Sequence, residues 1–69
     1  MTAVKIVKIL GVSTESWEDA AHEAVAEATE TIDDIHGVEV ESWTAEVADG
    51  AITEYKATVE VAFLIHRGQ

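Results

Sequence analysis

Carboxylates are the most numerous side chains in this sequence that could do chemistry, because 14 Asp and Glu stand against only 4 Lys and Arg. Four of them, Glu39, Glu41, Glu46 and Glu60, are expected to share one face of a β-sheet. If copies of the chain meet at a symmetry axis, each glutamate becomes a ring of carboxylates, which suits a hard cation that takes several oxygen ligands. A solvated acidic surface is the commoner reason for such a pattern, and the sequence does not identify the metal ligands.

Other reactive side chains do not form a recognisable catalytic or metal-binding motif. His22, His36 and His66 lie far apart, and no two have the i, i+4 spacing of a zinc-binding pair. Ser13 and Ser16 lie in a turn with no neighbouring base. Cysteine is absent, which excludes disulfides and thiolate metal sites. We therefore expect a protein that is not an enzyme.

Lys56 is one of the few cationic side chains, and its position predicts that it points to the same face as the four glutamates. It could bind a phosphate or a carbonyl group of a ligand. The alternative is a cross-strand ion pair with Glu39, Glu41 or Glu46.

Trp43 is the second candidate for contact with a ligand. Counted along its strand, it has the same parity as Gly37 and points away from Val38 and Val40. It either stacks on a ligand or fills a contact between copies of the chain, where tryptophan is enriched.

The charge of the chain limits its partners. A formal net charge of −10 disfavours nucleic acid and anionic membranes, both of which need clustered Lys and Arg. The sequence has no apolar signal segment after Met1 and no run of about 18–20 apolar residues, so a cytoplasmic location is expected.

The elements that position these side chains follow the order β-α-β-β. A β-branched run at 4–10, ended by Gly11, predicts the first strand. Ser16 is a candidate helix N-cap, and apolar residues then recur at helical spacing as far as Ile35, with Gly37 as the expected C-cap. The expected helix therefore includes His36 in its last turn.

Two strands complete the pattern. The second is expected to start at Val38, and Asp49-Gly50 predicts a two-residue hairpin turn. In the third, alternate side chains from Tyr55 to Ile65 are expected to pack on the helix. The prediction is a single α+β domain over residues 1–69, in which a three-stranded antiparallel sheet curls around one helix.

One helix covers one face of such a sheet, which leaves the other face to a partner. That face is expected to carry Trp43, Ala62 and Leu64. A chain of 69 residues without disulfides is also small for independent stability. Both observations predict association with identical copies, with binding sites between them.

Three segments carry a resemblance to a known family. GVSTESWEDAA at 11–21, VADGAI at 47–52 and YKATVEVAF at 55–63 resemble the dodecins, in this order and at these spacings. The resemblance implies a hollow homododecamer, with flavins bound in pairs between protomers in many members. Trp17 matches a common aromatic position of the family, which implies a packing role.

The resemblance also locates the flavin site. In the family, a tryptophan at the start of the second strand stacks on the flavin ring, and Gly37 takes that position here. A glutamine on the third strand binds the polar edge of the flavin, and Lys56 takes that position. Glycine offers no aromatic surface, and lysine offers only donors. Members without the tryptophan are linked to divalent cations such as calcium.

These observations predict a non-catalytic, homo-oligomeric protein that binds or stores a small ligand. Flavin binding is expected to be weak or lost, with cations or another small ligand, such as coenzyme A, held at protomer interfaces. The alternative is a functional storage protein for riboflavin, FMN or FAD with an altered pocket. The candidate cofactor-binding residues are Gly37, Trp43, Glu46 and Lys56.

Overall fold

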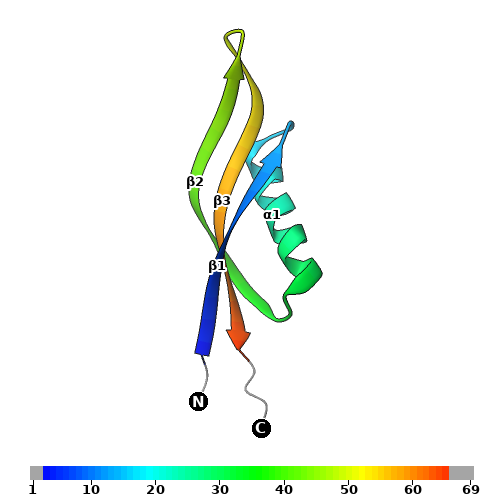
Figure 1. Cartoon of the computed structure of the whole chain (residues 1–69), viewed down its shortest axis with the longest axis vertical. Coiled ribbons are helices and arrows are strands. Elements are labelled where there is room, and N and C mark those ends of the chain that lie inside the picture. Colours follow the sequence, from blue (N-terminus) through cyan, green and yellow to red (C-terminus); the bar gives the residue numbers. More distant parts are fainter. Residues whose placement is uncertain (1–2, 66–69) are drawn as a thin grey trace.

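The computed structural model describes residues 3–65, which form one helix and three strands in the predicted order. The elements are β1 (Ala3–Ser13), α1 (Trp17–Thr31), β2 (Ile35–Ala48) and β3 (Ala51–Ile65). The strands form an antiparallel sheet in the order β1-β3-β2, and α1 lies along one face of it (Figure 1). The sheet is much longer than the helix, and the β2–β3 hairpin extends past the start of α1.

Helix α1 begins as its sequence predicts. Ser16 is the N-cap, and its hydroxyl accepts a hydrogen bond from the Asp19 amide at 2.9 Å. The Asp19 carboxylate in turn accepts one from the buried Ser13 hydroxyl at 2.7 Å. These bonds satisfy polar groups that the turn between β1 and α1 would otherwise leave without partners.

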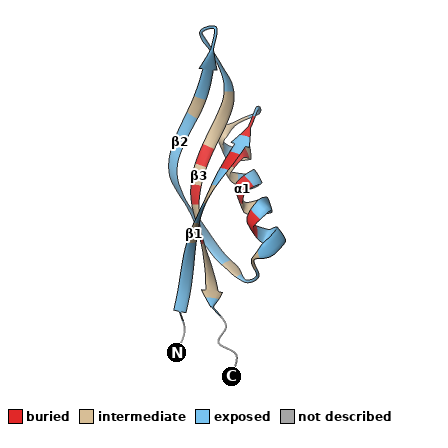
Figure 2. Ribbon diagram, in the orientation of Figure 1, coloured by how far each residue is buried: buried red, intermediate tan, exposed pale blue. Residues whose placement is uncertain are grey.

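The core is thin because the buried stripe of the helix is alanine. Ala24 and Ala28 of α1 pack with Val59 and Val61 of β3, and all four are almost completely buried (Figure 2). Gly11 of β1 lies against the same helix. A Cβ atom built there would be 1.9 Å from the Ala20 carbonyl oxygen, so only glycine fits this contact.

The first two strands have different bounds from those predicted. Strand β1 continues through Gly11 to Ser13, because glycine allows the helix to lie directly on the strand. The helix ends at Thr31, and Ile32 is already extended at φ −120° and ψ 127°. Gly37 is therefore not the C-cap.

The chain turns after the helix at Asp34, which has the positive φ of 58° that the sequence analysis assigned to a glycine. Aspartate is one of the few other residues that adopt this conformation readily. Two aspartates at 33 and 34 would also be unfavourable at the negative end of a longer helix. As a result, Ile35, His36 and Gly37 belong to β2.

Strand register defines two faces of the sheet. The helix face carries Ala57, Val59 and Val61 of β3, as predicted, whereas Ile65 is 37% exposed. We call the opposite face the outer face. There, Val4 lies beside Leu64 and Ile6 beside Ala62. Leu64 and Ala62 thus lie on the face for which they were predicted.

The outer face also exposes an apolar stripe of β1 that the sequence analysis did not single out. Within residues 3–65 no element covers this stripe, and its members are 42–58% exposed: Val4, Ile6, Leu10 and Val12.

A β-bulge in β2 changes the face on which Trp43 lies. Val40 pairs with Val59, but after the irregularity between Val40 and Ser42 the partner of Trp43 is Ala57. The extra residue reverses the alternation, so Trp43 lies on the helix face and not on the face of Gly37. The predicted position of Trp43 was therefore wrong.

The hairpin turn has the predicted geometry. Asp49 and Gly50 have φ values of 53° and 77°, and both must be positive in a type I′ turn.

Candidate functional site

A hollow on the outer face surrounds Gly37 and has a volume of about 250 Å³. Gly37 is paired with Ala62, and Glu39 is directly opposite Glu60. We call it the outer-face hollow, and its lining comes from all three strands: Ile6, Gly37, Val38, Glu39, Glu60 and Ala62.

Gly37 leaves space in this hollow. A Cβ atom at this position would meet no atom within 4 Å, and its φ is not in the left-handed region. A larger side chain therefore fits without strain. None of the lining residues is aromatic, so one chain offers no stacking surface for a flat ring there.

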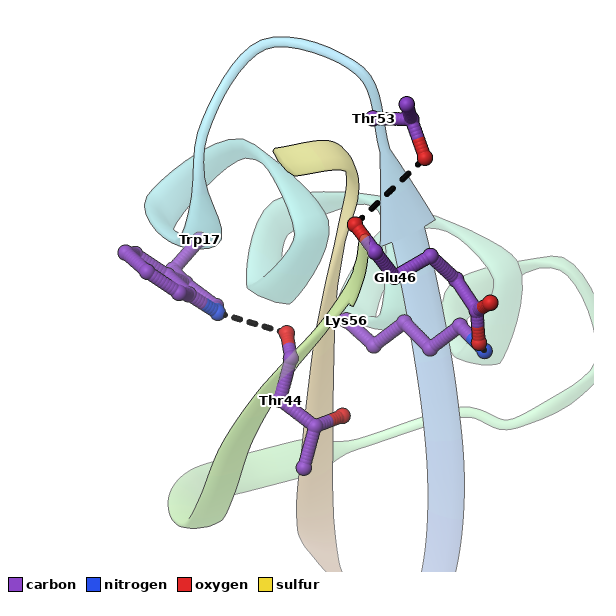
Figure 3. A network of polar contacts seen from close by, with 5 residues as sticks. All are labelled: Trp17, Thr44, Glu46, Thr53 and Lys56. Carbon is purple, nitrogen blue, oxygen red and sulfur yellow. Dashed lines mark hydrogen bonds and ion pairs between the residues drawn. The ribbon is translucent and has the colours of Figure 1, made fainter. Parts of the chain in front are cut away.

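Lys56 and Glu46 form an ion pair on the outer face, with Nζ and Oε2 2.6 Å apart (Figure 3). The pair confirms one of the predicted cross-strand alternatives. The hydrogen bond and the positive charge of Lys56 lower the pKa of Glu46 from 4.5. The hydrogen bond that Lys56 donates to Glu46 raises the pKa of Lys56 from 10.5. In this arrangement Glu46 is the partner of Lys56, and a ligand would have to replace that contact.

A second pair on this face joins Lys8 to Glu41 at 3.3 Å. Glu39 and Glu60, by contrast, form no ion pair within the described part of the chain. Both carboxylates that line the outer-face hollow are therefore without an ion-pair partner in this part of the chain.

A second hollow lies on the helix face, near the start of α1, and has a volume of about 540 Å³. It is lined by Ser16, Trp17, Glu18 and Trp43. The Trp17 ring meets Tyr55 and Trp43 edge to face, with centroids 4.8 Å and 6.3 Å away. Its Nε1–H donates to the Thr44 carbonyl at 2.7 Å, so Trp17 packs as predicted (Figure 3).

The structure divides the predicted site residues among three places. Gly37 lines the outer-face hollow, Glu46 and Lys56 form an ion pair nearer the hairpin, and Trp43 lies on the opposite face. Sequence analysis missed Ile6 as a lining residue, because pairing between distant strands is not visible in local spacing. The alternation of β1 places Ile6 on the face opposite to that of the partly buried Val7 and Ile9, and this signal could have identified it.

Residues 3–65 contain neither a cluster of metal-binding side chains nor a membrane-spanning helix. No three histidine or acidic side chains there are close enough together to bind a metal ion. The helix in this range is not long and apolar enough to cross a membrane. His66, predicted on the outer face of the third strand, lies outside the described residues.

Comparison with known proteins identifies relatives that match almost the whole chain. The Dodecin family model matches residues 3–66. The calcium dodecin of Mycobacterium tuberculosis (strain ATCC 25618 / H37Rv) is 35% identical over 69 residues, covering 100% of this chain and 97% of the relative.

Solved structures show the same fold. The crystal structure of the M. tuberculosis calcium dodecin, described as calcium-chelating, matches with a TM-score of 0.82 and 37% identity, covering 97% of this chain and 96% of the other. A mutant of the Thermus thermophilus dodecin matches with a TM-score of 0.93 and 26% identity, covering 99% and 100%. The chain belongs to the dodecin family.

Proposed function

We propose that this dodecin is a non-catalytic homododecamer that holds a small ligand in the outer-face hollow, between protomers. Flavin binding there is weak or lost. The observation that carries the proposal is Gly37, which lines a hollow with free space and no aromatic side chain.

The missing aromatic surface accounts for weak flavin binding. A stacked aromatic pair is worth about 0.5–1.5 kcal/mol beyond the area that it buries, and a symmetric site loses this contribution twice. Lys56, at the position of the family's glutamine, is occupied by Glu46 at 2.6 Å and would have to break that bond to reach a ligand.

A non-catalytic role agrees with the state of the reactive groups. Ser13 is the buried polar side chain among residues 3–65, and its hydroxyl donates to Asp19 and accepts from the Glu15 amide at 2.9 Å. It therefore completes the turn before α1, and at 7% exposure it is buried away from any substrate.

Flavin titration tests this proposal. We expect wild-type protein to quench added riboflavin weakly or not at all. Gly37→Trp should bind riboflavin at least about tenfold more tightly, since tenfold corresponds to about 1.4 kcal/mol. Val47→Trp adds the same side chain at a position that is 65% exposed on the hairpin, so it serves as the matched control.

Two results would contradict the proposal. Tight binding of riboflavin or FMN by the wild type would support the alternative, a flavin-storage protein with an altered pocket. Equal affinities for Gly37→Trp, Val47→Trp and wild type would mean that the outer-face hollow is not the ligand site.

A divalent cation is the second candidate ligand. Glu39 and Glu60 are directly opposite each other, and a relative is a calcium dodecin. Calcium takes six to eight oxygen ligands, so two carboxylates from one chain fit only if other copies supply the remainder.

Thermal melting with and without calcium tests the second candidate. A ligand at a concentration 100 times its Kd stabilises the folded state by about 2.7 kcal/mol, which raises the melting temperature. Glu39→Gln/Glu60→Gln should abolish this rise, whereas Glu23→Gln/Glu27→Gln on the exposed side of α1 should retain it. A rise that survives in both double variants would place the cation elsewhere.

A further inference from the structure

The outer-face hollow has an unbalanced charge that bears on the kind of ligand it accepts. Five carboxylates share this face with two ammonium groups, those of Lys8 and Lys56. The carboxylates are those of Glu39, Glu41, Glu46, Glu54 and Glu60. Each ammonium group pairs with a carboxylate outside the hollow lining, at 3.3 Å to Glu41 and 2.6 Å to Glu46. Of the other three, Glu54 lies opposite Glu46 and outside the hollow lining, whereas Glu39 and Glu60 belong to the lining.

We infer that the outer-face hollow selects neutral or cationic ligands over phosphate-bearing ones, and that Glu39 and Glu60 make this selection. The inference rests on the proposed function, because it concerns the ligand class of the same site. It predicts that a flat neutral molecule is favoured, whereas nucleotide-like flavins and coenzyme A are rejected.

The apolar part of the lining supports the same conclusion. Ile6 and Ala62 offer contact to an uncharged ring, and Gly37 leaves the space above them open. A phosphate group entering the hollow would meet two carboxylates and no free ammonium group among the described lining residues. The negative charges of the phosphate and the carboxylates repel each other strongly where protein excludes water, and less strongly at high salt.

Neighbouring copies in the proposed assembly add to the repulsion of phosphate-bearing ligands. Each chain carries a formal charge of −10, so the whole assembly repels anions at long range. A local effect of Glu39 and Glu60 must therefore be separated from the effect of net charge. Two variants with the same change in charge, at different places, make this separation.

Riboflavin and FMN are suitable probes because they share one ring system and differ by a phosphate. We would measure both affinities by fluorescence titration at one pH, in wild type and in Gly37→Trp. Riboflavin should bind at least about tenfold more tightly than FMN at low salt. The reason is that repulsion between the FMN phosphate and a carboxylate of the hollow weakens FMN binding by about this factor. The ratio should fall in 1 M salt, where the screening length is about 3 Å.

The matched variants assign the selection to particular residues. Glu39→Gln/Glu60→Gln should reduce the riboflavin-to-FMN ratio to about threefold or less. Glu23→Gln/Glu27→Gln removes the same two charges from the exposed side of α1 and should leave the ratio near its original value.

Each contrary result has a distinct meaning. If FMN binds as tightly as riboflavin, the inference is wrong while the proposed ligand site stands. If both double variants reduce the ratio equally, net charge makes the selection and the assignment to Glu39 and Glu60 is wrong. If neither flavin binds to Gly37→Trp, both the proposed site and the inference are wrong.

Discussion

At the scale of single residues, Lys56 has a structural role that its sequence position left open. The sequence left two roles open, a ligand contact and a cross-strand ion pair. The structure shows the pair, with Glu46 as the partner at 2.6 Å. Both side chains are at the surface, where the contribution of such a pair is small and depends on salt.

The pH dependence of this pair follows from the two pKa shifts. Because the pKa of Glu46 is lowered in the folded state, its contribution to stability is present above its ordinary pKa of 4.5 and is lost as the pH falls through the folded value. Because the pKa of Lys56 is raised, its contribution is present below 10.5 and is lost as the pH rises through the folded value. The pair therefore stabilises the fold at neutral pH.

We expect Glu46→Gln to lower the free energy of unfolding slightly at pH 7 and to have less effect at pH 3. Urea denaturation of wild type and variant at both pH values measures this difference. Glu30→Gln, at an exposed position of α1, provides the control. An equal loss at pH 3 and pH 7 would mean that the carboxylate charge of Glu46 does not matter.

The contact between β1 and α1 determines how closely the helix packs on the sheet. Gly11 brings the strand so close that a Cβ atom would be 1.9 Å from the Ala20 carbonyl oxygen and 3.0 Å from the Ala24 Cβ. The obstacle is helix backbone, which cannot rotate away as a side chain can. A methyl group there must separate the two elements.

Gly11→Ala is therefore expected to destabilise the protein by about 1–3 kcal/mol or more, the usual cost of overpacking a core. Gly37→Ala is the matched control, because its Cβ would meet nothing within 4 Å and should leave stability almost unchanged. Urea denaturation of both variants measures the difference. Equal stability of the two variants would show that α1 can move away from β1 at little cost.

The elements also show which structural features a sequence reveals. The start of α1 at Ser16, the hairpin at Asp49-Gly50 and the buried positions of β3 depend on local residue types, and the structure confirms them. The predicted end of α1 was wrong because Asp34 adopts the positive φ that was expected of Gly37.

Trp43 was misplaced for a different reason. Alternation along a strand predicts the face of a residue only while the strand pairs without irregularity. The bulge between Val40 and Ser42 depends on pairing with β3, which local spacing does not encode. The face on which Gly37 lies was predicted correctly, because no bulge intervenes between Gly37 and Val40.

At the scale of the whole molecule, the exposed outer face is the strongest reason to expect assembly. Its apolar stripe in β1 includes Ile6 and Leu10, which are 58% and 52% exposed. A chain of 69 residues buries only about 60% of the surface that its unfolded form exposes, so covering this stripe adds needed stability.

Leu10→Lys should therefore weaken the assembly, because each interface would bury an unpaired charge. Sedimentation velocity should show wild type as one large species and the variant as smaller species, down to the 7.4 kDa chain. Thr29→Lys adds the same charge at an exposed position of α1 and should sediment like wild type. A compact 7.4 kDa wild type at micromolar concentration would contradict the assembly.

The irregular pairing of β2 has a further effect on the behaviour of the protein at high concentration. With the strand order β1-β3-β2, β2 is an edge of the sheet, and its register shifts at three points along its length. An edge strand with regular backbone groups is a template for fibril growth, whereas bulges twist the edge and interrupt such a ladder. The β2 edge should therefore resist the addition of further strands, so that association through the faces of the sheet is favoured over growth from this edge.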